Sequence, residues 1–87
     1  MRRNIKEYLK GKYDANFSYI EKVINSCKTV EQLKSAVSWG LDYLIRISKH
    51  EQGQCSRSEY RAVDNYAGEK EAVIMGVFHD SLELLNS

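Results

Sequence analysis

Proline is absent from the 87 residues, and the five glycines are scattered rather than clustered. Proline interrupts helices and glycine weakens them, so this composition favours helix and excludes a flexible linker. Hydrophobic residues make up 43% of the chain and charged residues 29%, which is typical of a folded protein. At this length we expect one domain, residues 1–87, built around a single core.

Cysteine and long apolar runs are also scarce. The two cysteines, Cys27 and Cys55, with no secretory signal at the start, favour a reducing, cytoplasmic location with both thiols free. No apolar run approaches the roughly 18 residues that a membrane span needs. Neither cysteine is spaced from His50 or His79 as in the tight pairs of zinc sites, so we expect no metal and no cofactor.

Catalytic motifs are missing as well. The sequence has no phosphate-binding glycine loop, no GxSxG and no HExxH. Glu69 and Glu71 point to different sides of any helix and so do not form a pair of catalytic carboxylates. The sequence therefore predicts that the protein is not an enzyme.

Apolar residues recur every three or four positions in three regions, which is the spacing of one helical face. The first region has Ile5, Tyr13, Phe17, Ile20 and Ile24; the second has Leu33, Val37, Leu41 and Leu44; the third has Tyr60, Val63, Ala67 and Ile74. Gly11 weakens the first region, and Ser18 with Glu21 matches a capping box that starts a new helix. We expect two N-terminal helices broken near residue 13, or else a single bent helix.

The second and third regions each begin with a capping box. Thr29 with Gln32 precedes a helix over about 30–50, and Gly53 is placed to end it with a positive φ. Ser56 with Glu59 precedes a helix over about 57–85. Short connections make neighbouring helices antiparallel. We therefore predict an all-α small bundle: an antiparallel hairpin of these two helices, with one or two N-terminal helices packed across it.

A second stripe of side chains follows the helix over 30–50. Its members are Trp39, Tyr43, Arg46 and His50. Steps of three and four residues put them on one line, roughly 120° around the helix from the core face, and they belong to residue types frequent at binding hot spots. This stripe is our candidate partner-binding site. The alternative is that the N-terminal helices cover Trp39 and Tyr43 as part of the core.

Positive charge gathers at the beginning of the chain. The first twelve residues contain Arg2, Arg3, Lys6, Lys10 and Lys12, opposed only by Glu7. Residues 1–50 carry a net charge of +5 and residues 51–87 a net charge of −4. A basic helix of this kind can bind phosphates of a nucleic acid, or it can be an ordinary solvated face. The opposite charges of the two halves can also attract each other within the fold.

Small residues form a line along the last helix. Gly68, Ala72 and Gly76 follow one another at intervals of four, largely away from the apolar face. A second backbone can approach closely there, so these residues are a candidate homodimer contact. The alternative is that they simply face solvent.

These patterns favour a small non-enzymatic regulator or inhibitor, of the kind that phages and plasmids encode, which docks a helical surface on a partner protein. Two alternatives stay open. One is a nucleic-acid-associated protein that uses the basic N-terminal helix, and the other is an oligomer that binds a small anionic ligand.

Overall fold

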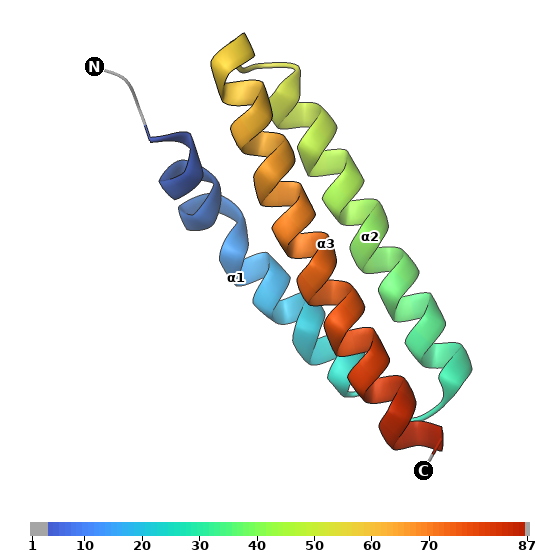
Figure 1. Cartoon of the computed structure of the whole chain (residues 1–87). Coiled ribbons are helices and arrows are strands. Elements are labelled where there is room, and N and C mark those ends of the chain that lie inside the picture. The colour runs from blue at the N-terminus through green and yellow to red at the C-terminus, as the bar shows by residue number, and fades with distance from the viewer. Residues whose placement is uncertain (1–3, 87) are drawn as a thin grey trace.

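The computed structural model describes residues 4–86, which form three helices: α1 (Ile5–Asn25), α2 (Val30–Gln52) and α3 (Arg57–Asn86). No strand occurs in residues 4–86, so the prediction of an all-α fold is confirmed. The three helices lie side by side, with α2 running opposite to α1 and α3 (Figure 1). The start of α1 and the α2–α3 connection therefore lie at one end of the bundle, and the α1–α2 connection lies at the other.

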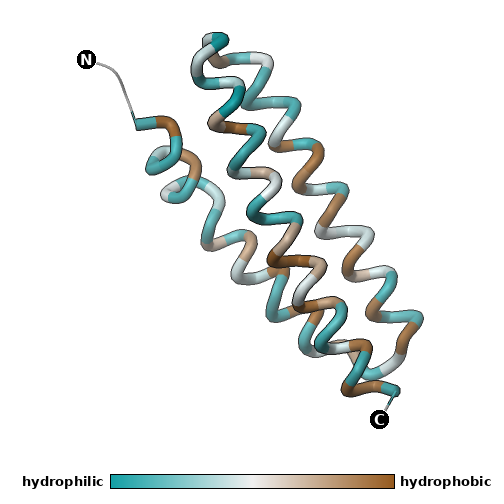
Figure 2. The backbone as a smooth tube through the Cα atoms, viewed as in Figure 1, coloured by the Kyte–Doolittle hydropathy of each residue, from teal (hydrophilic) through white to brown (hydrophobic). Residues whose placement is uncertain are grey.

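One apolar face of each helix contributes to a shared core, and polar residues separate these apolar positions along each helix (Figure 2). The buried hydrophobic residues are Leu9, Tyr13, Phe17, Ile20, Ile24, Leu33, Ala36, Val37, Leu44, Val63, Tyr66 and Ile74. Burying each large apolar side chain contributes about 1.5–3 kcal/mol, and these residues are the main source of stability. Tyr60, which the periodicity assigned to the core face, is 52% exposed, and Tyr66 is buried instead.

The N-terminal region is one continuous helix, so the predicted break near residue 13 is wrong. A Cβ at Gly11 would meet no atom within 4 Å, and this glycine costs only about 1 kcal/mol of helix propensity. Burial of Tyr13 just beyond it outweighs that cost. Ser18 lies inside the helix and does not cap it. The N-cap is Asn4, whose Oδ1 accepts a hydrogen bond from the Glu7 backbone N–H at 3.3 Å.

Both of the other capping residues are where the sequence predicted them. Thr29 Oγ1 accepts from the Gln32 N–H at 3.1 Å, and the Ser56 N–H donates to Glu59 Oε1 at 3.2 Å. The positive φ expected at Gly53 is wrong, because Gly53 has φ −70° and continues the helical turn. Its N–H donates to the Lys49 carbonyl at 3.0 Å, so right-handed backbone leads directly into the connection to α3.

The three helices approach one another closely at Gly40 of α2. A Cβ built on Gly40 would lie 2.8 Å from Ile20 Cγ2 of α1 and 3.7 Å from Ile74 Cδ1 of α3. The first distance is shorter than any normal carbon–carbon contact, and the methyl group of a β-branched side chain cannot turn away freely. Only glycine at position 40 therefore permits this spacing between α1 and α2.

We predict opposite behaviour for alanine at Gly40 and at Gly11. Gly11→Ala should raise the free energy of unfolding by about 0.5–1 kcal/mol through helix propensity. Gly40→Ala gains the same helix propensity, but its methyl group overpacks the core, which costs about 1–3 kcal/mol. The Gly40→Ala variant should therefore be about 1–3 kcal/mol less stable than the Gly11→Ala variant. Urea unfolding of both variants measures the difference, and equal stabilities would show that the close approach is absent.

Candidate protein-binding face

The stripe predicted from the sequence lies on the side of α2 that is next to α1. Trp39 is 45% exposed, Tyr43 is half-buried, and Arg46 and His50 are exposed. The alternative was that the N-terminal helices cover Trp39 and Tyr43. In the structure α1 covers Tyr43 in part and leaves Trp39 exposed. The indole is the most prominent apolar group on this side of α2.

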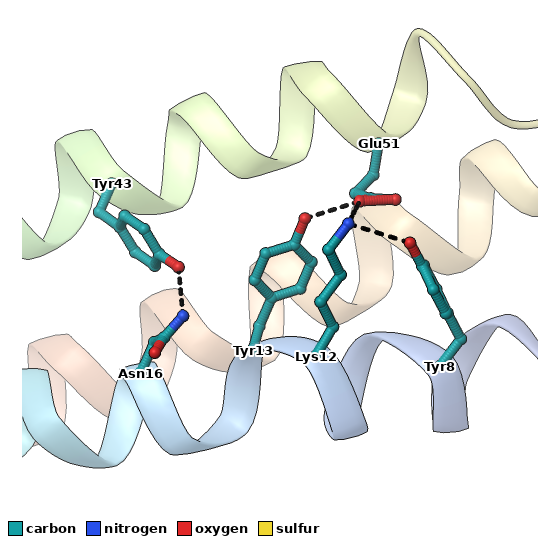
Figure 3. Close-up of polar contacts among 6 residues, drawn as sticks. All are labelled: Tyr8, Lys12, Tyr13, Asn16, Tyr43 and Glu51. Atoms are coloured by element: carbon teal, nitrogen blue, oxygen red, sulfur yellow. Dashed lines mark hydrogen bonds and ion pairs between the residues drawn. The ribbon is translucent and has the colours of Figure 1, made fainter.

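Residues of α1 hold both aromatic side chains of the stripe in place. Tyr19 and Trp39 meet edge to face, with ring centroids 6.2 Å apart, and Phe17 meets Tyr43 in the same way at 5.7 Å. Asn16 Nδ2 donates a hydrogen bond of 2.7 Å to the Tyr43 hydroxyl (Figure 3). Each aromatic pair adds about 0.5–1.5 kcal/mol beyond its buried area. The exposed aromatic surface is thus fixed in orientation before any partner arrives.

Two pockets open along the seam between α1 and α2. The first, of about 290 Å³, is lined by Asn16, Tyr19, Ile20, Trp39 and Tyr43. The second, of about 500 Å³, is lined by Val23, Cys27, Gln32 and Ala36 among others. We call the two pockets together the α1/α2 groove. Sequence periodicity did not select Tyr19, because its place in the groove depends on how α1 and α2 are aligned.

A buried carboxylate joins α1 to α2 near the end of this groove. Glu51, with a side chain only 3% exposed, accepts from the Tyr13 hydroxyl at 2.6 Å and from Lys12 Nζ at 3.2 Å (Figure 3). Lys12 Nζ also donates to the Tyr8 hydroxyl at 3.1 Å. The helix predicted from the sequence over about 30–50 stopped just before Glu51, which in the structure belongs to α2. The signal for burial was its position seven residues after Leu44, on the core face.

The charge on Glu51 is stabilised by its neighbours. Burial raises the pKa of this carboxyl, but the hydrogen bonds from Tyr13 and Lys12 outweigh burial and hold the pKa below its ordinary value. Burial and the hydrogen bond to Glu51 raise the pKa of Tyr13 to about 12. At neutral pH Glu51 is therefore a carboxylate and Tyr13 a neutral phenol.

A second polar cluster joins α1 to α3. Asp14 Oδ1 accepts from the Tyr66 hydroxyl at 2.7 Å and pairs with Lys70 Nζ at 3.0 Å. The Tyr66 hydrogen bond, followed by that from Lys70, lowers the pKa of Asp14. Lys12, Tyr13 and Asp14 are consecutive, so one turn of α1 is fixed to both other helices.

The basic N-terminal residues are only partly available to a ligand. Lys6 Nζ lies 3.9 Å from a Glu69 oxygen, and Lys12 is paired with Glu51, whereas Lys10 is exposed. Both pairs join the basic first half of the chain to the acidic second half. The other two members of the predicted nucleic-acid patch, Arg2 and Arg3, lie outside the described residues.

The line of small residues lies on the outer side of α3. Gly68, Ala72 and Gly76 are exposed, and a Cβ at either glycine would meet no atom within 4 Å. No contact within residues 4–86 explains the small size of Gly68 and Gly76, and the homodimer contact there stays a prediction.

The described part of the chain contains neither a metal-binding cluster nor a membrane-spanning helix. Residues 4–86 hold no cluster of three or more His, Cys, Asp or Glu side chains suited to a metal ion. In the same range, no helix combines the length and the apolar character needed to cross a membrane.

Comparison with known proteins gave no relative: no protein-family model, no curated protein and no solved structure matches this chain. We therefore infer function from the geometry of the candidate face.

We predict that Glu51→Leu lowers the free energy of unfolding by about 1–3 kcal/mol, because the buried Tyr13 hydroxyl loses its acceptor. The double variant Tyr13→Phe/Glu51→Leu removes both polar partners and should recover most of that loss. A double-mutant cycle in urea tests this coupling. Independent effects of the two substitutions would contradict the hydrogen bond.

We also predict a loss of stability in acid. The pKa values of Glu51 and Asp14 lie below their ordinary values of 4.5 and 3.8 in the folded protein, so their stabilisation is complete above those values. It is lost as the pH falls through the lower, folded-state values. Unfolding measured from pH 6 to about pH 2 should show this decline. The free energy of unfolding should fall less steeply with pH in the double variant Glu51→Gln/Asp14→Asn. An unchanged slope would show that neither carboxyl causes the loss of stability in acid.

Proposed function

We propose that this protein is a small non-enzymatic regulator or inhibitor that binds a partner protein through the α1/α2 groove. The observation that carries the proposal is Trp39, an indole that is 45% exposed, meets Tyr19 edge to face and forms the wall of a pocket. Tryptophan, tyrosine and arginine are the residues most frequent at the centres of protein interfaces.

The groove has the composition of an interface with an apolar centre and a polar rim. A pocket of about 290 Å³ is large enough to take one large apolar side chain of a partner. Arg46 and His50 continue the same line beyond the aromatic residues and supply hydrogen-bond donors at the rim. Because Tyr43 and Trp39 are already held by α1, little side-chain entropy is lost on binding.

Two further predictions belong to this proposal. We infer that the protein binds its partner as an α2–α3 hairpin with α1 packed on it, because the groove exists only when α1 lies against α2. We also infer a cytoplasmic location, supported by two free cysteines, Cys27 and Cys55, which are typical of a reducing compartment.

The proposal is tested by capture of partners from the native cell, followed by binding measurements with each purified partner. Wild-type protein and Trp39→Ala are compared, with Val73→Ala as the control, because Val73 is 39% exposed on another helix. Trp39→Ala should weaken binding at least tenfold, which is the loss of about 1.4 kcal/mol or more expected at a hot spot. Val73→Ala should bind as the wild type does. Equal affinities for all three proteins would refute the proposed face.

A further inference from the structure

The side of α3 that points away from the core carries a line of exposed residues. We call this line the outer face of α3; its members are Arg61, Gly68, Ala72, Gly76 and Glu83. At about 100° per residue, all five lie within about 40° of Ala72 around the helix, and Val63 of the core lies about 180° from it. The outer face is therefore left uncovered by α1 and α2.

Charges of opposite sign lie at the two ends of the outer face. Arg61 comes eleven residues before Ala72 and Glu83 eleven residues after it, which is about 16.5 Å in each direction along the helix. Both side chains are exposed, and neither forms an ion pair within residues 4–86. The two ends are thus equally distant from Ala72 and opposite in charge.

The other charged residues near this face preserve the difference between its ends. In the first half of α3, within about 80° of Ala72 around the helix, two arginines outnumber one aspartate. These three residues are Arg57, Arg61 and Asp64. Glu69, on the same side, is paired with Lys6 of α1 at 3.9 Å. The second half of α3 has no lysine or arginine after Ala72, and its acidic residues near the face are Asp80 and Glu83.

The middle of the outer face permits another helix to come close. A Cβ at Gly68 or Gly76 would meet no atom within 4 Å, and each glycine lies four residues from Ala72. The distance between two packed helices depends on the size of the side chains at their contact. The small residues therefore allow a close approach, and the charges beyond them determine which helix fits.

We propose that a second copy of this chain occupies the outer face of α3, in an antiparallel dimer with its two-fold axis at Ala72. Such an axis sets each residue before Ala72 opposite the residue equally far after it on the other copy. Arg61 of each copy then faces Glu83 of the other, and the two glycines face each other. A parallel arrangement sets like charges together at both ends, which is unfavourable.

This interface leaves the candidate protein-binding face open. The residues that line the two pockets of the α1/α2 groove come from α1, α2 and the connection between them, and none belongs to α3. Each dimer therefore presents two grooves. The dimer does not depend on the proposed function, so Trp39→Ala should leave it unchanged.

The test is analytical ultracentrifugation of the full chain over a series of concentrations at low salt. Wild-type protein should change from monomer to dimer as its concentration rises. Arg61→Glu and Glu83→Arg each set like charges together at both ends, so each variant alone should dimerise at least tenfold more weakly. An equimolar mixture of the two variants restores opposite charges at both ends and should dimerise as the wild type does. The matched control is Arg46→Glu, an exposed arginine on α2, which should leave dimerisation unchanged.

Three results would overturn the dimer. The first is a wild-type chain that stays monomeric at every concentration. The second is a dimer that neither charge reversal weakens, or that the mixture of variants does not restore. The third is a dimer that Trp39→Ala converts to monomer, because the second copy would then occupy the α1/α2 groove. The first two results leave the proposed function intact, since binding of a partner through Trp39 is measured separately.

Discussion

The contact of Ile20 with Gly40 is the constraint on which the functional surface depends. Because position 40 has no side chain, the Ile20 methyl group reaches the backbone of α2, with Ile74 of α3 behind it. Ile20 is only 2% exposed, and it also lines the first pocket of the groove. The packing that closes the core at this point therefore also forms the floor of the candidate binding site.

The polar clusters fix the alignment of α1, which the apolar core alone leaves less well defined. Lys12 and Tyr13 reach the buried carboxylate of α2, while Asp14 reaches Tyr66 of α3. Apolar contacts are non-directional, whereas charge-assisted hydrogen bonds require particular partners at particular distances. Fixing residues 12–14 in this way places Asn16 against Tyr43 and Tyr19 against Trp39, one and two turns further along.

The sequence predicted the parts of the fold that depend on local chemistry. Capping at Thr29 and Ser56 follows from side chains that bond backbone groups three residues away, so these helix starts were readable. The same reasoning failed at Gly11, because a local weakness is outweighed by burial of Tyr13, which involves residues far along the chain. Local propensity is a weak predictor wherever tertiary packing opposes it.

The candidate site was predictable only on one helix. The spacing of Trp39, Tyr43, Arg46 and His50 is a property of α2 by itself, and it pointed to a single line of residues. The opposite wall, with Tyr19, requires the alignment of α1 against α2. That alignment depends on Gly40 and Glu51, two residues whose roles appear only when the helices are brought together.

Trp39 lies half-exposed in an open groove between α1 and α2. Trp39 is the only tryptophan in the chain, so its fluorescence reports on this one position. Acrylamide quenching should proceed at a rate between those of a buried and a free indole, and should not change as the protein is diluted. A blue-shifted emission that acrylamide does not quench would show a covered indole and would contradict the account.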